Sequence, residues 1–316
     1  ALELDEPVSA ILWVGDEAAV ALGDGTVRFC NPDEAPARIA ASHEGAVLCA
    51  ALDPSRAAIL TGGDDGRVLR TDREGLVTEL GRFGKWVDHL VASPVSGFVV
   101  AGVGKEAIVW KPGAGVPSHR YAFPSTIGGL ALDGKGKRLA ASHYGGASLV
   151  YVSSADSTPA LLPWGGSHLA CAFRPEGDFL ITATQELGLH GLKLPERTDM
   201  MMRGYRAKTR SFSWSRRNKH LATSGDVRAV IWPFEAKDGP MGKPPMLVGE
   251  RPSVVTQVAF QPNSTMLAIG YEDGAVFLIR IEDDAYLPVE EPGAGSVTAL
   301  AWNKDGSRLG WGCEDG

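Results

Sequence analysis

The sequence has few cysteines, no long apolar run and no secretory start. Only four of its 316 residues are cysteine and none forms a Cys-x-x-Cys pair, which excludes a disulfide-rich secreted scaffold. No stretch approaches the roughly 18 uninterrupted apolar residues of a transmembrane helix. The first residues, ALELDEPVSA, lack the basic start and apolar run of a signal peptide. These absences predict a cytoplasmic protein without a membrane segment.

Motifs that carry chemistry are also missing. The sequence contains no GxSxG elbow, no phosphate-binding loop and no dinucleotide fingerprint. Its seven histidines show no HxH or HExxH spacing, so a local zinc motif is absent. The cysteines lie in or at the end of apolar runs and are predicted to be structural thiols. We therefore expect no catalytic residue, no metal and no cofactor.

An excess of positive charge is lacking as well. The 31 Lys and Arg residues face 38 Asp and Glu residues, for a net charge of -7. This balance argues against general binding of polyanions. Turn formers, in contrast, are abundant: 39 glycines and 20 prolines make long helices improbable.

A repeated phrase organises the chain. Its form is Val-x-x-apolar-small-apolar, followed by a turn, an apolar strand, a Gly/Asp turn and a further strand. Successive openings are separated by 39, 40, 40, 41, 41, 46 and 42 residues, a period typical of four-stranded propeller blades. The openings are Val8, Val47, Val87, Ile127, His168, Thr209, Val255 and Val297.

The second unit shows the internal pattern most clearly. It reads VLCAALD, AILTGG, RVLRTD and LVTELG, with turn residues between these segments, which predicts four antiparallel strands. In three units an Asp-Gly step lies 18 residues after the opening, at Asp65, Asp273 and Asp315. A tight turn at a constant place indicates true repeats.

The residues resemble the WD40 repeat family. HLACAFRPEGDFL and VTQVAFQPNSTML fit its first strands, and AIVWKP at Trp110 and AVIWPF at Trp232 fit its third strands. No third strand carries a Trp-Asp dipeptide. The segment SHEGAV at His43 is the only one that resembles the family's Gly-His pair before the first strand. The resemblance covers essentially the whole chain. It implies blades closed around an axis and loops that hold a protein partner.

We therefore predict a single all-β domain over residues 1–316, a β-propeller of four-stranded antiparallel blades. Eight openings favour eight blades over seven. The last unit has two strands and stops at a turn at Gly316, so we expect further residues beyond 316. The N-terminal strand at residues 1–4 is expected to complete this last blade.

Charge is distributed unevenly, and this suggests a binding face. Residues 197–219 contain eight Lys or Arg residues against one Asp. Basic and aromatic residues on connections between units are typical interface anchors. The predicted partner-binding residues are Arg82, Lys85, Trp86, Arg203, Tyr205, Arg206, Lys208, Arg210 and Arg251.

The predicted function is a non-catalytic, monomeric scaffold that binds a protein or peptide. One alternative is an enzyme or small-ligand receptor that uses the central channel, with Asp88, His89 and Arg210 as the nominated polar residues. A second alternative is nucleic-acid binding through the basic loop 203–210. The acidic remainder of the chain disfavours it. A further interpretation places Trp86 between blades.

Overall fold

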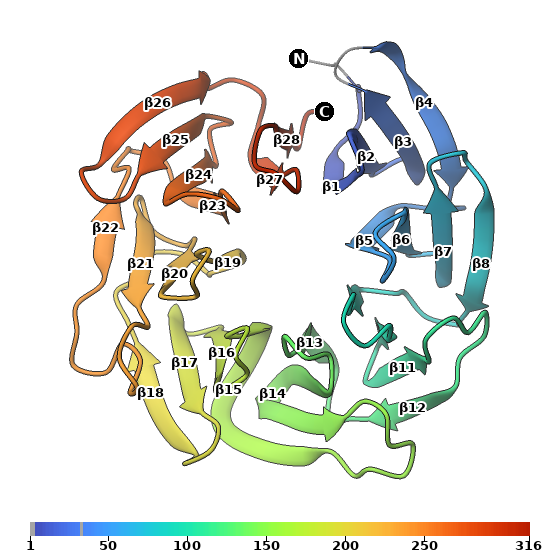
Figure 1. Cartoon of the computed structure of the whole chain (residues 1–316), viewed down its shortest axis with the longest axis horizontal. Helices are drawn as coiled ribbons and strands as arrows, with labels where there is room; N and C mark the ends of the chain where they lie inside the picture. Colours follow the sequence, from blue (N-terminus) through green and yellow to red (C-terminus); the bar gives the residue numbers. More distant parts are fainter. Residues whose placement is uncertain (1–3, 32–33) are drawn as a thin grey trace. The chain divides into compact units, whose positions relative to one another are not determined.

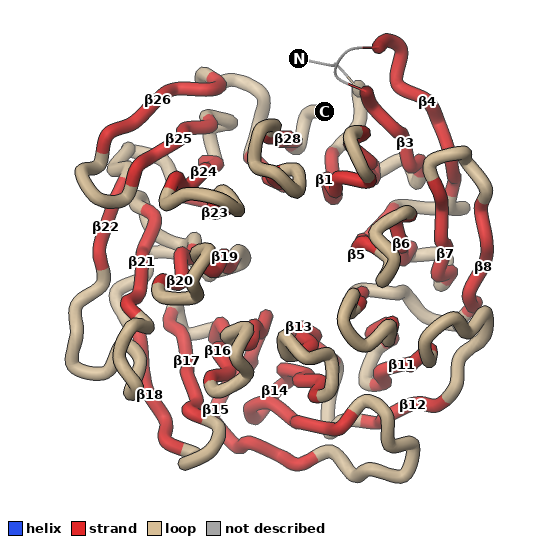
Figure 2. The backbone as a smooth tube through the Cα atoms, in the orientation of Figure 1, coloured by secondary structure: helices blue, strands red, loops and turns tan. Residues whose placement is uncertain are grey.

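The structure is a computed structural model that describes residues 4–31 and 34–316. These residues form antiparallel strands joined by turns and loops, and no helix is found among them (Figure 2). In this part of the chain no helix is therefore long and apolar enough to cross a membrane. The all-β prediction is confirmed.

The strands assemble into seven sheets over the described residues (Figure 1). The first sheet contains β1 (Val8–Val14), β2 (Glu17–Leu22), β3 (Thr26–Asn31) and β4 (Glu34–Ser42). The second sheet contains β5 (Val47–Leu52), β6 (Ala58–Gly63), β7 (Arg67–Asp72) and β8 (Val77–Arg82). The next sheet contains β9 (His89–Ala92), β10 (Val99–Val103), β11 (Glu106–Trp110) and β12 (His119–Ala122). Each of these sheets follows chain order, so every connection is a hairpin.

A six-stranded sheet comes next. It contains β13 (Ile127–Leu132), β14 (Arg138–Tyr151), β15 (Ala160–Phe173), β16 (Phe179–Thr184), β17 (Gly188–Lys193) and β18 (Thr198–Met202). Two four-stranded sheets follow. One contains β19 (Phe212–Trp214), β20 (His220–Thr223), β21 (Ala229–Pro233) and β22 (Met246–Val248). The other contains β23 (Val255–Phe260), β24 (Met266–Tyr271), β25 (Val276–Arg280) and β26 (Ala285–Glu290). The last sheet has two strands, β27 (Val297–Trp302) and β28 (Leu309–Cys313).

The fold is a β-propeller built from four-stranded antiparallel blades, but the predicted count of eight is wrong. Six of the seven sheets of the described chain have four or more strands, so the structure has six blades. The predicted fourth and fifth units share one sheet, because β15 is a single strand that spans the end of one unit and the opening of the next. The predicted eighth unit is the two-stranded sheet.

The strand β14 hides a hairpin that the sequence pattern anticipates. Its first half pairs with β13 and its second half with β15. The chain folds back on itself between these halves, since the Val152 N–H donates to the Lys137 carbonyl at 3.0 Å. Gly145 and Gly146 have φ values of 87° and 132°, which suit a reversal.

The residues group into two compact units, Ala1–Ile11 with Glu186–Gly316, and Leu12–Gln185. Within the second unit, buried clusters lie between consecutive sheets. One cluster joins Leu60 and Val68 of the β5–β8 sheet to Val99 and Trp110 of the β9–β12 sheet. A sheet in this unit therefore covers its apolar face with the next sheet along the chain, as the repeat predicts.

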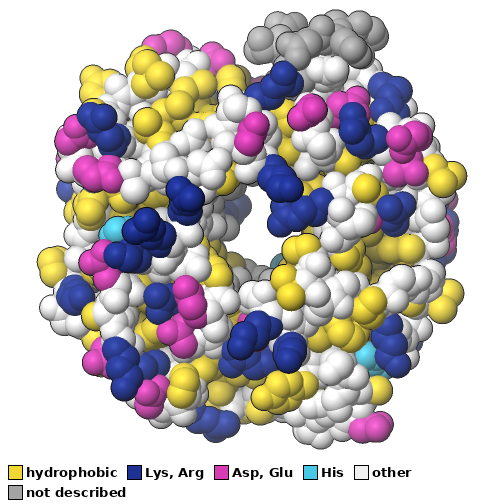
Figure 3. Space-filling model, viewed as in Figure 1, with side chains coloured by type: hydrophobic (Ala, Val, Ile, Leu, Met, Phe, Trp, Pro, Cys, Tyr) yellow, Lys and Arg dark blue, Asp and Glu magenta, His cyan; other side chains and the backbone are white. Residues whose placement is uncertain are grey.

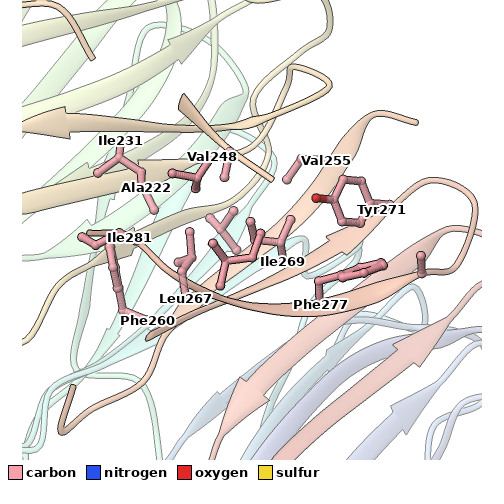
Figure 4. Packing of buried hydrophobic residues seen from close by; sticks show 14 residues of the cluster. Ala222, Ile231, Val248, Val255, Phe260, Leu267, Ile269, Tyr271, Phe277 and Ile281 are labelled. Carbon is pink, nitrogen blue, oxygen red and sulfur yellow. The ribbon is translucent and has the colours of Figure 1, made fainter. Parts of the chain in front are cut away.

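The same arrangement recurs in the first unit (Figure 4). Ala222, Ile231 and Val248 of the β19–β22 sheet pack with Leu267 and Ile269 of the β23–β26 sheet. The cluster removes large aliphatic side chains from water, which is the main favourable contribution to folding.

The expected completion of the last blade by the N-terminal residues stays a prediction. Residues 1–3 of the predicted segment 1–4 lie outside the described residues. In the unit that contains both ends of the chain, the Thr298 hydroxyl donates to the Val8 carbonyl at 2.5 Å. A Cβ atom on Gly312 would clash with the Val8 side chain. The start of β1 thus packs beside the β27–β28 sheet, and β1 heads its own sheet with β2.

Candidate functional site

A buried polar network fixes the loop that enters β5. The His43 ring places Nδ1 3.0 Å from Asp65 Oδ1 and Nε2 2.9 Å from Thr61 Oγ1. Burial opposes ionisation of Asp65, but N–H groups of Arg67 and the His43 ring hydrogen-bond its carboxylate and hold its pKa below the usual range. This network connects the loop before β5 to the Asp-Gly turn after β6, so both are held in one conformation.

Tyr205 occupies the corresponding position in another blade. It lies four residues before the opening at Thr209, as His43 lies four residues before Val47. Its hydroxyl is 2.8 Å from Thr223 Oγ1 and accepts a 2.7 Å hydrogen bond from Trp232 Nε1. Only 7% of Tyr205 is exposed and burial raises its pKa. Tyr205 is therefore a structural residue and not the exposed interface residue that we predicted.

Arg251 stands at this position before β23, four residues ahead of Val255. Its Nη2 is 3.3 Å from Asp273 Oδ2, and its guanidinium lies 5.4 Å and 4.7 Å from the ring centroids of Tyr271 and Phe277. An arginine between a carboxylate and two aromatic rings is engaged inside its own blade. Arg251 thus has structural contacts in its own blade, and its role in partner binding stays a prediction.

Three other predicted residues lie at the end of β8 and on the loop that follows it. Trp86 is 62% exposed, so the interpretation that places it between blades is wrong. Lys85 is exposed, and its stem lies over Gly104, where a Cβ atom would meet Lys85 Cδ at 3.4 Å. Arg82 is also exposed and is 3.5 Å from both Glu44 and Glu79. A large aromatic ring next to cations is thus presented to solvent.

The remaining predicted residues lie on the loop between β18 and β19, in the other compact unit. Arg203, Arg206, Lys208 and Arg210 are all exposed. Arg206 Nε is 3.2 Å from the buried Asp226 carboxylate. On the face seen in Figure 3, basic side chains occur in several separate groups, many of them beside acidic ones.

Of the three residues nominated for channel chemistry, His89 has a structural partner. His89 Nε2 is 3.2 Å from the Ile127 carbonyl, and burial lowers its pKa. The Cys49 thiol donates to the Val87 carbonyl at 3.2 Å, and burial raises its pKa, which keeps it a thiol at neutral pH. All four cysteines are free, as predicted. Among the described residues, no group of three or more His, Cys, Asp or Glu side chains could hold a metal ion.

Two segments of the chain match a known family. Residues 36–69 and 246–279 match the model of the WD40 family, described as WD domain, G-beta repeat. The first segment contains His43 and Asp65, and the second contains Arg251 and Asp273. These matches confirm the resemblance to WD40 repeats that the sequence suggested. No curated protein matches the chain.

Solved structures share the fold at low sequence identity. The crystal structure of the computationally designed Ika8 protein is 16% identical, with a TM-score of 0.84 over 100% of this chain and 96% of that chain. The RRP9 WD40 repeats are 16% identical, with a TM-score of 0.66 over 86% and 88% of the two chains. The structure of U3-55K is 17% identical, with a TM-score of 0.66 over 86% of this chain and 89% of that chain. At such identities these structures show the fold alone.

Proposed function

We propose that this β-propeller with WD40 repeats is a non-catalytic scaffold that binds a protein or peptide through loops between its strands. The WD40 propeller fold typically serves as a protein-interaction scaffold. The observation that carries the proposal is the exposure of Trp86, 62% of which contacts solvent. Burying this ring against a partner would remove a large apolar surface from water.

The surroundings of Trp86 fit this role. Val87, the next residue, is fully buried and its N–H donates to the Gly63 carbonyl at 3.1 Å. Phe83 donates its N–H to the Gly66 carbonyl at 2.8 Å. The short loop is therefore fixed at both ends, and little conformational entropy is lost when Trp86 is covered. Arg82 and Lys85 add polar contacts at its rim.

Retention of a partner tests the proposal. The intact chain is immobilised, a native extract is applied, and retained proteins are identified by mass spectrometry and rebound in purified form. We expect Trp86→Ala to weaken binding of the purified partner roughly tenfold or more. The matched control is Tyr286→Ala, because Tyr286 is another exposed aromatic residue, with 70% of its surface in solvent. Equal binding by wild type and Trp86→Ala, or no retained protein at all, contradicts the proposal.

A further inference from the structure

The loop between β18 and β19 has no regular secondary structure, yet one carbonyl group anchors its first half. The N–H groups of Arg206 and Ala207 both donate to the Gly225 carbonyl, at 3.0 and 2.8 Å. Gly225 has a φ of 103°, and a Cβ atom there would lie 2.9 Å from the Ala207 carbonyl oxygen. This close approach of two backbone segments requires glycine.

Ser224 anchors the second half of the loop. Its hydroxyl oxygen accepts hydrogen bonds from the N–H groups of Arg210 and Ser211, both at 3.1 Å. The Thr209 hydroxyl donates to the Ser224 carbonyl at 3.0 Å. Ser224 and Thr209 are both buried. The backbone of residues 205–211 is thus fixed before any ligand arrives.

The side chains on this fixed backbone carry charge that the protein does not neutralise. Arg203, Lys208 and Arg210 are exposed, and none of the ion pairs found in the described part of the chain involves them. Arg206 and Arg228 both face the buried carboxylate of Asp226, at 3.2 and 3.9 Å. Lys208 and Arg210 are therefore free cations on the fixed part of the loop, and Arg203 lies two residues before it.

We propose that the loop 203–210 is a preformed binding site for an acidic segment of a protein partner. The inference rests on the proposed scaffold function and specifies the chemistry of the ligand. Carboxylates pair with arginine and lysine, and a rigid loop loses little entropy on binding. Residues 197–219, which include this loop, hold eight Lys or Arg residues against one Asp, whereas the whole chain has a net charge of -7. This distribution fits a short acidic peptide better than a long polyanion, which the rest of the chain would repel.

Fluorescence anisotropy with defined probes tests this assignment. The probes are a labelled peptide of six Glu-Ser repeats, the matching Lys-Ser peptide, and a dT12 oligonucleotide, each with the intact chain at low salt. We expect the Glu-Ser peptide to bind and the other two to bind far more weakly. The double variant Lys208→Glu with Arg210→Glu is expected to weaken binding of the Glu-Ser peptide roughly tenfold or more. Added salt is expected to weaken wild-type binding.

The control variant reverses two exposed lysines elsewhere in the same compact unit, Lys237→Glu with Lys243→Glu. It changes the net charge equally and should leave peptide binding close to wild type. Thermal melting establishes that both variants are folded, and the neutral pair Lys208→Gln with Arg210→Gln replaces the first variant if it is not. The assignment is overturned if the loop variant and the control variant lose peptide affinity equally. It is also overturned if the Glu-Ser peptide does not bind, or if dT12 binds more tightly than the Glu-Ser peptide.

These outcomes separate the two proposals. A partner that depends on Trp86 but binds the Lys208→Glu, Arg210→Glu variant normally would leave the scaffold function standing and refute the acidic-ligand site. Specific binding of the Glu-Ser peptide to the loop, without any protein retained from an extract, would refute the scaffold function and keep an anion site.

Discussion

One position in the repeat shows how different residues meet the same structural requirement. Four residues before an opening phrase, His43, Tyr205 and Arg251 each reach from a loop to the following hairpin of their own blade. The histidine and tyrosine both contact a threonine 14 residues after the opening, Thr61 and Thr223. A buried polar group needs a partner, and each residue type meets this requirement with its own hydrogen bonds.

The sequence could have revealed this role through its spacing. We recognised His43 by its resemblance to the family motif, whereas Tyr205 and Arg251 were predicted to be interface residues from their type alone. Their common offset from Thr209 and Val255 was present in the sequence. The type of a residue does not determine whether its side chain is exposed to solvent. The burial of Tyr205 and the exposure of Trp86 could therefore not be predicted from residue type.

Removing the Tyr205 hydroxyl tests its structural role. In Tyr205→Phe, the Trp232 indole N–H and the Thr223 hydroxyl lose a buried partner. We expect the free energy of unfolding to fall by about 1–3 kcal/mol, measured by urea denaturation. The control Tyr286→Phe removes an exposed hydroxyl and should change the free energy of unfolding by less than about 0.5 kcal/mol. Similar values for the two variants would show that the Tyr205 network contributes nothing.

The Asp65 carboxylate should make stability depend on acid pH. Its pKa is lowered in the folded state from an ordinary value of 3.8, so near and below pH 3.8 the unfolded chain binds this proton more readily than the folded one. The stabilisation is fully present above the ordinary pKa and is lost as pH falls through the folded pKa. We expect the destabilisation caused by Asp65→Asn to be largest above about pH 5 and to shrink below pH 4. Urea denaturation across this range measures it, and a constant difference would contradict the assignment.

At the scale of the elements, the repeat predicted most strands and where they turn. The four strands of the second unit match β5 to β8 closely. The predicted number of blades was wrong because backbone geometry sets the hydrogen bonds between consecutive strands. The pattern of apolar residues does not reveal that β15 continues from one unit into the next without a break. The same pattern cannot distinguish a full blade from a two-stranded sheet such as β27–β28.

The cluster between two neighbouring sheets should dominate local stability. Ile269 is fully buried between the β19–β22 and β23–β26 sheets. We expect Ile269→Ala to lower the free energy of unfolding by about 2–5 kcal/mol, because it removes buried methyl and methylene groups and leaves a cavity. The control is Leu287→Ala on β26, where the side chain is 60% exposed. A cost for Ile269→Ala that does not exceed the control would show that the sheets do not share this core.

The rigidity of the loop 203–210 depends on its glycine contact. We expect Gly225→Ala to strain the backbone at a φ of 103° and to separate it from the Ala207 carbonyl. Hydrogen exchange should then accelerate at the amides of Arg206, Ala207, Arg210 and Ser211. Gly113→Ala is the control, since that glycine also has a positive φ, of 73°, but has no atom near its Cβ position. Unchanged exchange in Gly225→Ala would mean that the loop is held by other contacts.

For the molecule as a whole, the sequence predicted the fold class better than the site. The period near 40 residues and the recurrent Asp-Gly turns predict four-stranded blades, because both features follow from the local chemistry of strands and turns. Binding surfaces depend on which loop side chains stay in solvent. Of the nine predicted residues, the structure buries Tyr205, half-buries Arg251, and leaves the other seven exposed: Arg82, Lys85, Trp86, Arg203, Arg206, Lys208 and Arg210.

Site-specific photo-crosslinking tests the central claim most directly. A benzophenone amino acid is placed at position 86, 208 or 286 of the intact chain, and the purified partner is added before irradiation. The account predicts crosslinks from positions 86 and 208 and none from position 286. Crosslinking that is absent at 86, or equally strong at 286, would contradict partner binding through these loops.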